Sequence, residues 1–278
     1  MKRNLLIVSV ILLSVATLFA QNKKKMTAQE VCIVMADLDR VPDYNYTTLL
    51  LENISKSGKS EVLEIKQYGG GDNGLKNVAF DFRAPASVRG MRVLQLEKVK
   101  KADDRWVYEP RLRQSRRIPM TERTKSFGGT EFTYNDMRIR NETEDKNTMM
   151  DEAAQITVAG RKYICWKIKS VPVKKSEVEY AYRISWVEQD TFIPVHVEFY
   201  NDKDVKIKLY ECEKLEKVKG VTGIEYPLRR VNRLTNLVTG NQTVATVKEF
   251  VFDDVVPSAF FTQSWLTTGK VPRGNKKK

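Results

Sequence analysis

Residues 180–200 read YAYRISWVEQDTFIPVHVEFY and alternate apolar with polar side chains along two successive runs. In the first run, one side of an extended chain carries Tyr180, Tyr182, Ile184 and Trp186. In the second run, one side carries Ile193, Val195, Val197 and Phe199, opposite His196 and Glu198. A repeat of two residues is typical of a strand that is buried on one face only. The stretch therefore predicts antiparallel strands in a sheet with one apolar and one solvated face.

The same period of two dominates the chain from Thr47 to Phe252, with turn residues such as Gly69–Gly74 at short intervals. This pattern predicts one large antiparallel sheet. We expect about eleven strands, at Thr47–Lys56, Ser60–Tyr68, Asn77–Ala84, Arg92–Val99, Trp106–Glu109, Lys162–Ser170, Val178–Val187, Phe192–Tyr200, Asp204–Leu215, Ile224–Leu234 and Thr243–Val251.

Few helices accompany this sheet. Thr27 is predicted to cap a helix that ends near Leu38, because Glu30 completes a capping box and apolar residues recur at helical spacing. Residues 136–152 are polar and predict a loop or short helix that crosses an open side, and residues 254–266 predict a final short helix. So few helices cannot cover eleven strands. The sheet must therefore either close into a barrel or curl around a cavity. A barrel whose interior is fully packed with side chains is the alternative to a cavity.

The N-terminus predicts an exported protein. Lys2 and Arg3 precede an apolar run from Leu5 to Phe19, and the small residue Ala20 follows. This succession predicts a secretory signal peptide over residues 1–20, cleaved near Ala20. The run is shorter than the roughly 20 residues that a spanning helix needs. An uncleaved anchor is the alternative.

Cleavage would leave residues 21–278, enough for a single domain with a substantial core. The formal net charge of the whole chain is +13, part of it in basic tails at 21–26 and 270–278. An exported protein rarely meets nucleic acid, so we expect no nucleic-acid partner. An anionic membrane surface or a lipid head group is the more natural partner of the excess charge.

Residue types for catalysis and metal binding are scarce. The single histidine, His196, has no second histidine and no cysteine beside it, which argues against Ser-His-Asp, Cys-His and multi-histidine metal sites. Gly128-Gly129 and Gly69–Gly71 lack the following Lys-Ser/Thr pair of a phosphate loop. We therefore expect no enzymatic activity, no catalytic or metal-binding residues and no cofactor.

Cys32, Cys165 and Cys212 form an odd set, which leaves at least one free thiol in an exported chain. We expect buried free thiols that pack as small apolar side chains. A bridge between the strands that carry Cys165 and Cys212 is the alternative.

One segment carries a specific likeness to a known family. Residues 106–137 read WVYEPRLRQSRRIPMTERTKSFGGTEFTYNDM: a short aromatic strand, a basic turn, and the stretch Ser126–Asp136. The likeness to the same family extends upstream to residues 84–90 and Leu94. Downstream it extends, in the same order along the chain, to residues 182–187, 194–200, 229–232 and 250–261. Over roughly residues 27–266, the chain resembles the LolA-like outer-membrane lipoprotein-sorting family.

The resemblance implies a mainly β (α+β) fold, a curled antiparallel half-barrel with a helical lid and an apolar cavity between them. It implies a periplasmic carrier that binds acyl chains of lipoproteins or lipids in that cavity for transfer towards the outer membrane. Transfer partners in the inner and outer membranes follow from that role. The alternative is a non-carrier interaction module of the cell envelope on the same fold.

We expect large apolar side chains of the predicted strands to line the cavity: Leu94, Trp106, Tyr108, Trp166, Tyr182, Trp186, Val197 and Phe199. The turn after the aromatic strand is crowded by Arg111, Arg113, Arg116 and Arg117. We interpret these four arginines as a basic rim at the cavity mouth that meets lipid phosphates or an acidic partner. A solvated basic loop is the alternative.

Overall fold

The computed structural model describes residues 25–39, 41–71, 75–98, 101–137, 140 and 142–271. The predicted signal peptide, residues 1–20, lies outside these ranges, as does most of each basic tail. Within them the protein is one antiparallel sheet of 13 strands with few helices.

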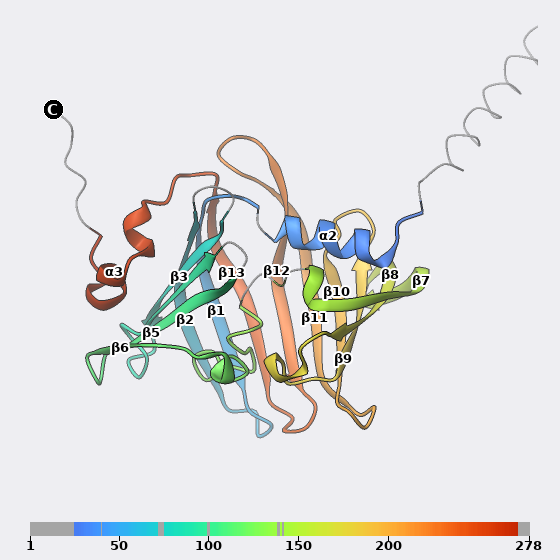
Figure 1. The fold of residues 1–278 in the computed structure, drawn as a ribbon, viewed down its shortest axis with the longest axis horizontal. Helices are drawn as coiled ribbons and strands as arrows, with labels where there is room; N and C mark the ends of the chain where they lie inside the picture. Colours follow the sequence, from blue (N-terminus) through green and yellow to red (C-terminus); the bar gives the residue numbers. More distant parts are fainter. Residues whose placement is uncertain are drawn as a thin grey trace, which may run out of the picture.

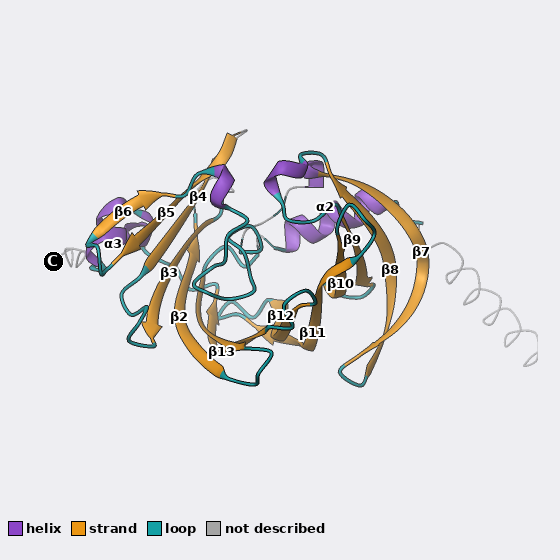
Figure 2. Ribbon diagram, turned by 90° about the horizontal axis from the view of Figure 1, so that it is seen from below, coloured by secondary structure: helices purple, strands orange, loops and turns teal. Residues whose placement is uncertain are grey.

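The strands follow one another in space in the order β6-β5-β4-β3-β2-β1-β13-β12-β11-β10-β9-β8-β7, and the two edge strands do not pair. The sheet is therefore a half-barrel, curled into a trough that stays open (Figures 1 and 2). The strands are β1 Asn45–Ile54, β2 Ser60–Gly70, β3 Asn77–Ala84, β4 Arg92–Lys98, β5 Lys101–Glu109, β6 Gln114–Arg117, β7 Asp145–Val158, β8 Arg161–Pro172, β9 Tyr182–Glu188, β10 Pro194–Tyr200, β11 Lys206–Lys219, β12 Glu225–Asn236 and β13 Gln242–Phe252.

The order of the strands has one consequence for the site. Because β1 pairs with β13, the described chain enters and leaves the sheet at its middle. The two edges, β6 and β7, are thus consecutive in sequence and lie at opposite ends of the sheet. The described part of residues 118–144 (118–137, 140 and 142–144), which we call the crossing segment, lies between the two edges inside the trough (Figure 2).

Two strands correct the sequence analysis. Residues 114–117, expected as part of a basic turn, form β6, and the second part of the polar stretch 136–152, expected as a loop or short helix, belongs to the 14-residue strand β7. Among the described residues of this stretch, Glu142–Glu144 form the 3₁₀ turn η2 directly before β7. β7 is an edge strand with exposed side chains on both faces, so it shows little of the apolar alternation that marks a half-buried strand.

Helix α2, Ala28–Leu38, forms where the sequence predicts it, and the capping box between Thr27 and Glu30 is present. Its buried side chain Val31 packs against Ile168 of β8 and Val187 of β9, on the inner face of the sheet. The helix therefore covers the β7–β9 end of the trough. No helix among the described residues is long and apolar enough to cross a membrane.

The predicted final helix consists of the 3₁₀ turn η4, Ser258–Phe261, and helix α3, Gln263–Thr268. Both lie against the outer face of the β3–β6 end, away from the trough (Figure 2). Trp265 and Leu266 are buried there in a cluster with Ala79, Leu94 and aromatic side chains of β2 and β5. Within the described residues, the sheet thus has one α-helix on each face.

Candidate functional site

The stretch Ser126–Asp136 lies inside the trough as part of the crossing segment. Phe127 is fully buried, with its ring 5.1 Å from that of Phe80 and 5.4 Å from that of Phe82. Gly128 has φ +64°, and a Cβ there would come within 2.7 Å of the Phe82 ring. A residue without a side chain is therefore required for this close approach. The most family-like stretch of the sequence fills the inner face of β2 and β3.

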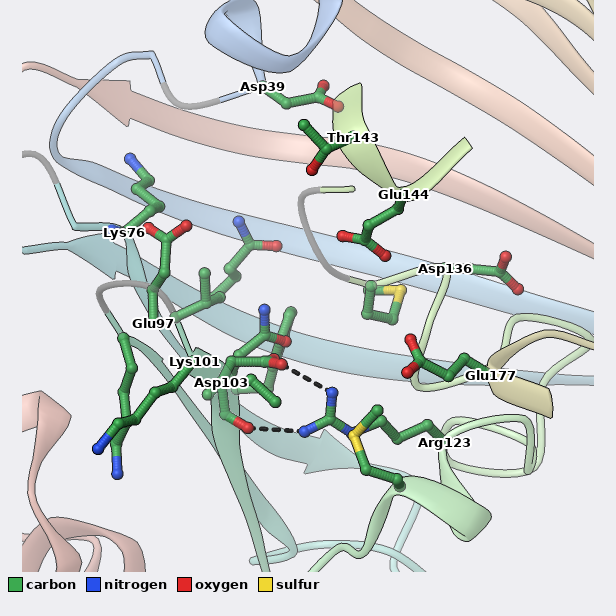
Figure 3. A pocket seen from close by; sticks show the side chains of 18 of the residues that line it. Asp39, Lys76, Glu97, Lys101, Asp103, Arg123, Asp136, Thr143, Glu144 and Glu177 are labelled. Carbon is green, nitrogen blue, oxygen red and sulfur yellow. Dashed lines mark hydrogen bonds and ion pairs between the residues drawn. The ribbon is translucent and has the colours of Figure 1, made fainter. Parts of the chain in front are cut away.

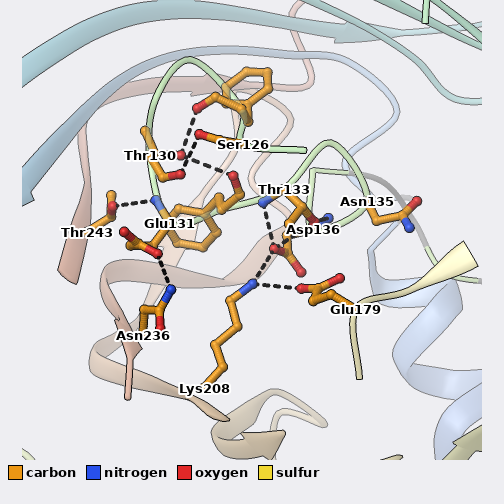
Figure 4. A network of polar contacts seen from close by, with 12 residues as sticks. Ser126, Thr130, Glu131, Thr133, Asn135, Asp136, Glu179, Lys208, Asn236 and Thr243 are labelled. Carbon is orange, nitrogen blue, oxygen red and sulfur yellow. Dashed lines mark hydrogen bonds and ion pairs between the residues drawn. The ribbon is translucent and has the colours of Figure 1, made fainter. Parts of the chain in front are cut away.

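Polar contacts fix the same stretch to the other half of the trough (Figure 4). The backbone N–H of Glu131 donates to Thr243 Oγ1 at 2.9 Å, and its carboxylate accepts from Asn236 Nδ2 at 2.9 Å. Lys208 Nζ donates to Asp136 Oδ2 at 3.0 Å and to Glu179 Oε1 at 2.9 Å. Burial by itself lowers the pKa of Lys208, but the two carboxylates outweigh it and the pKa is raised. The crossing segment is tied to β11, β12 and β13.

An ion-pair group holds the start of the crossing segment. Arg123 Nη1 donates to Asp103 Oδ1 at 2.8 Å and its Nη2 donates to the Asp103 carbonyl at 2.6 Å. Arg105 Nε donates to the same carboxylate at 2.7 Å, and Arg105 Nη1 donates to the Tyr134 carbonyl at 2.6 Å. All three side chains are nearly buried, so removal of the Asp103 carboxylate would take away the anion that both arginines share.

The space left between sheet, crossing segment and α2 forms two adjoining lobes. The first, which we call the apolar lobe, has a volume of about 330 Å³. Its apolar lining consists of Leu38, Val41, Pro42, Leu49, Leu51, Phe132, Met137, Ile193, Tyr210, Tyr226, Pro227, Leu228, Ala245, Val247 and Phe252. The second, the polar lobe, has a volume of about 650 Å³. Both lobes are lined by Asp39, Asn45, Gln67, Asp136, Met137 and Arg229, which form their common boundary.

Charged side chains surround the polar lobe (Figure 3). Lys76 and Lys101 lie on the side formed by β3 to β5, and the carboxylates of Glu144 and Glu177 lie on the opposite side. The Arg123–Asp103 pair lies between the two sides. The two lobes together present an apolar compartment next to one lined by both cations and anions, the arrangement that suits an amphiphilic ligand.

The C-terminal end of α2 is tethered by charged groups. Asp39, which caps the helix, accepts from Arg229 Nη2 on β12 at 2.7 Å. Lys76 Nζ donates to the carbonyls of Pro42 and Asp43 in the link between α2 and β1. Burial lowers the pKa of Lys76 to about 8, although Asp43 opposes the shift. These contacts close the side of the lobes that lies next to the helix.

The structure places three of the eight predicted cavity-lining residues on the inner face of the sheet and five on the outer face. Val197 and Phe199 of β10 lie on the inner face, in the cluster that Phe132 of the crossing segment joins. Trp166 of β8 lies with α2, its ring 4.9 Å from that of Phe192. These three inner residues pack in the core, and neither lobe is lined by them.

The other five lie on the outer face. Leu94, Trp106 and Tyr108 are covered by α3 and η4. Tyr182 and Trp186 alternate with the inner residues Arg183 and Ser185, and lysines lie over their rings: Lys169 Nζ is 3.9 Å from the Tyr182 centroid and Lys167 Nζ is 4.6 Å from the Trp186 centroid. These five residues therefore do not line the lobes. The alternation of side chains along these strands was predicted correctly. Which of the two faces points into the trough was predicted wrongly for these five residues.

The four arginines do not gather at one rim. Arg111 and Arg113 are exposed at the β5–β6 turn, where Arg113 has φ +51°. Arg116 Nη1 donates to Glu122 Oε2 at 2.8 Å, whereas Arg117 pairs with Asp104. Arg116 and Arg117 are neighbours on a strand, so they point to opposite faces. All four side chains are exposed, and their role in binding lipid phosphates or an acidic partner stays a prediction.

The residues that do line the apolar lobe escaped the sequence analysis. Leu49 and Leu51 of β1 pair with Val247 and Ala245 of β13 in the middle of the sheet. Both strands alternate as predicted, yet their aliphatic side chains stood out less than tryptophan or tyrosine. The signal that could have found them is the pairing of the first and last strands, because it places them at the centre of the trough.

The three cysteines and the single histidine lie apart from the two lobes. All three cysteines are free, as predicted, and burial raises the pKa of the Cys165 thiol to about 12 and that of Cys212 to about 11. His196 lies on the outer face, 3.6 Å from Glu198 and 3.4 Å from Glu211. Among the described residues, no group of three or more His, Cys, Asp or Glu side chains could hold a metal ion.

Comparisons with known proteins place this geometry among related folds. A family described as an uncharacterised protein matches residues 74–268, and no curated protein matches the chain. A DUF1329 family protein from Desulfovibrio piger is similar in structure, with a TM-score of 0.75 and 23% identity over 86% of this chain and 97% of that one.

Two further solved structures share the fold. A putative outer membrane lipoprotein-sorting protein domain from Vibrio parahaemolyticus has a TM-score of 0.75 and 19% identity, over 86% of this chain and 98% of that one. A LolA superfamily protein from Nitrosomonas europaea has a TM-score of 0.62 and 20% identity, over 87% of this chain and 100% of that one. The predicted half-barrel with a helical lid is therefore confirmed as a LolA-like fold, with 13 strands in place of eleven.

Proposed function

Because the chain belongs to a family of uncharacterised proteins and has a LolA-like fold, we propose that it is a carrier that binds the acyl chain of a lipid or lipoprotein in its apolar lobe. The carrier acts in the periplasm and transfers its cargo towards the outer membrane, with partners in both membranes. No covalent step is part of this role, so the protein is not an enzyme.

The apolar lobe is the observation that supports this proposal. Its volume of about 330 Å³ lies in the range of small-molecule sites, roughly 300–1,000 Å³. Side chains of β1, β12 and β13 form one wall, and Leu38 at the end of α2 and Phe132 of the crossing segment lie among the other lining residues. Each CH₂ group moved there from water contributes about 0.8 kcal/mol, so an acyl chain needs no charged partner to bind.

The adjoining lobe explains how an amphiphile would be oriented. Asp39, Asn45 and Arg229 lie where the two lobes meet, so a ligand with its chain in the apolar lobe has its polar end at charged and amide groups. Asp39 also caps α2, so release of the ligand involves the end of that helix.

Native mass spectrometry after purification without detergent tests the proposal. We expect the mature protein to retain an acyl-bearing molecule. Ala245→Phe fills the apolar lobe and should reduce retention by about tenfold or more, because overpacking costs about 1–3 kcal/mol. Thr246→Phe is the matched control, since residue 246 faces the other side of β13 and should not affect retention. A wild-type protein that neither retains nor takes up acyl compounds would refute the carrier role.

A second candidate, an envelope interaction module, is favoured by the edge strand β7. Its 14 residues pair on one side only, so its other side offers backbone groups to an extended segment of another protein. Thr148→Pro would remove one N–H from β7. Loss of a co-purifying protein partner with this variant, together with a clean apo mass for the wild type, would support the module over the carrier.

A further inference from the structure

Two neighbouring turns at one end of the sheet carry arginines and no acidic residue. Residues 83–92, around the β3–β4 turn, read RAPASVRGMR, and residues 110–117, the β5–β6 turn with β6, read PRLRQSRR. The turns are in contact, because a Cβ on Gly90 would lie 3.7 Å from Pro110 Cβ. Of the arginines in the two stretches, Arg92 is buried and the rest are exposed. The turns therefore share one basic surface.

Three of the exposed arginines, Arg89, Arg111 and Arg113, form no ion pair among the described residues, and we call them the arginine patch. The Nε of Arg89 donates to the backbone carbonyl of Arg83 at 3.1 Å, a bond that leaves the charge uncompensated. A surface with several unpaired cations of one sign attracts anions.

The acidic residues that border the patch do not neutralise it. Asp81 already pairs with Arg83 at 2.9 Å. Glu109 already pairs with Arg116 at 3.2 Å. The positive charge of the patch is therefore left for a group outside the chain.

The backbone at Arg113 gives no reason for an arginine there. Its φ is +51°, in the left-handed region, and its N–H donates to the Pro110 carbonyl at 3.3 Å to close the turn. Glycine or asparagine adopts this conformation more easily than a residue with a long side chain. The turn itself thus favours another residue, and what arginine adds is an exposed charge.

Leu112 identifies the kind of anion. It lies between Arg111 and Arg113 at the turn and is 66% exposed, the one large apolar side chain of the two stretches that is exposed. A stable protein interface needs roughly 1,000 Å² with an apolar core, which one leucine does not supply. An apolar side chain flanked by cations suits a bilayer surface, where it enters the acyl boundary while guanidinium groups bind phosphates.

We propose that the arginine patch and Leu112 form a docking surface for an anionic lipid bilayer, with the guanidinium groups on lipid phosphates and the leucine at the acyl boundary. The surface is separate from the two lobes, since none of its residues lines either of them. Strand β5 runs from Lys101, which lines the polar lobe, to Glu109 beside the patch. The docking surface therefore does not depend on the proposed carrier function.

Co-sedimentation with vesicles of phosphatidylcholine, with and without phosphatidylglycerol, tests the surface at low and high salt. We expect the wild type to bind only the vesicles that contain phosphatidylglycerol, and less at high salt because the charges are screened. Arg89→Gln, Arg111→Gln and Arg113→Gln combined should bind about a hundredfold more weakly, since each cation near an anionic surface contributes about fivefold.

A matched control removes the same charge elsewhere. Lys146→Gln, Lys162→Gln and Lys217→Gln combined change three exposed lysines on β7, β8 and β11. This variant should keep most of the binding.

Two single variants separate docking from folding. Arg113→Gly should weaken binding about fivefold and leave the thermal unfolding midpoint unchanged or higher, because glycine suits the positive φ. Leu112→Ser should also weaken binding. Val238→Ser is its control, since Val238 is 74% exposed at the β12–β13 turn and should not affect binding.

Three results would overturn the inference. A wild type that ignores vesicles with phosphatidylglycerol would leave the patch to an acidic protein. Equal losses in the arginine and lysine triple variants would mean that only net charge matters. Unchanged binding in Leu112→Ser would remove the leucine from the surface. Native mass spectrometry of the arginine variant keeps the two proposals apart: cargo without vesicle binding in the wild type refutes the docking surface alone, and vesicle binding without cargo refutes the carrier alone.

Discussion

Helices α2 and α3 cover opposite faces of one sheet and are held in different ways. Beneath α3, Trp265 is 1% exposed and packs with Phe260, whose ring stacks on Tyr68 at a centroid distance of 4.1 Å. Arg92 Nε also donates to the Leu266 carbonyl at 2.6 Å at the end of the helix. An aromatic cluster closed by a buried arginine makes α3 a fixed part of the fold.

Helix α2 buries smaller side chains against the sheet than α3 does. Its fully buried side chain is the small Val31, and its C-terminal end depends on the Asp39–Arg229 pair and on the hold of Lys76 on the following carbonyls. Charged contacts near a surface are weaker than a buried aromatic cluster. The comparison indicates that the helix beside the lobes is the one that can move, as a lid must.

The largest expected effect lies under α3. Trp265→Ala should lower the free energy of unfolding by about 3–5 kcal/mol, because it empties a large buried site. Val31→Ala removes two methyl groups under α2 and should cost only about 2 kcal/mol. Urea unfolding monitored by circular dichroism measures both. An equal or larger loss with Val31→Ala would contradict the difference between the two helices.

An intermediate effect concerns Lys76, whose pKa is lowered to about 8 in the folded protein. Between about pH 8 and the unfolded-chain pKa of about 10.4, the unfolded chain binds more protons at this group than the folded chain. Stability should therefore rise with pH in the wild type relative to Lys76→Met, by up to about 3 kcal/mol. Lys101→Met, at an exposed position of the same lobe, is the control and should keep the wild-type slope.

The smallest effect on stability should come from the Asp39–Arg229 pair. Both side chains are about one-third exposed, so Asp39→Asn should cost less than about 1 kcal/mol. Hydrogen exchange of the α2 amides should nevertheless become faster, since the end of the helix loses its charged tether, while exchange in α3 stays the same. Asp37→Asn changes the same charge at an exposed position of α2 and serves as the control. Unaltered exchange in Asp39→Asn would show that apolar packing alone holds the lid.

Most strands could be predicted because apolar and polar residues alternate along a strand that has one buried and one solvated face. β10 is the clearest case, with Val195, Val197 and Phe199 buried between partly exposed neighbours. The pattern failed at β7 because most of this strand is uncovered on both faces, so its residues do not alternate between apolar and polar. The α2 capping box was predictable for a related reason, since its hydrogen bonds join residues only three positions apart.

The residues of the candidate site could not be predicted from the local sequence pattern alone. Alternation shows that Leu94 and Gln95 point to opposite faces, but which face lies inside depends on the direction in which the whole sheet curls. The sheet curls away from α3, so the apolar Leu94 is covered by that helix and the polar Gln95 faces the trough. A search for large apolar side chains therefore selected the outer face.

The amino-acid sequence by itself determined the class of fold, the position of α2 and the absence of a second histidine, because these follow from spacing between near neighbours and from composition. Only the tertiary structure decided which side chains line the lobes. The pairing of β1 with β13 and the position of the crossing segment inside the trough bring together residues such as Leu49, Phe132 and Val247 that are far apart along the chain. Such contacts depend on the closure of long loops and on the curl of the sheet, and no local pattern records either.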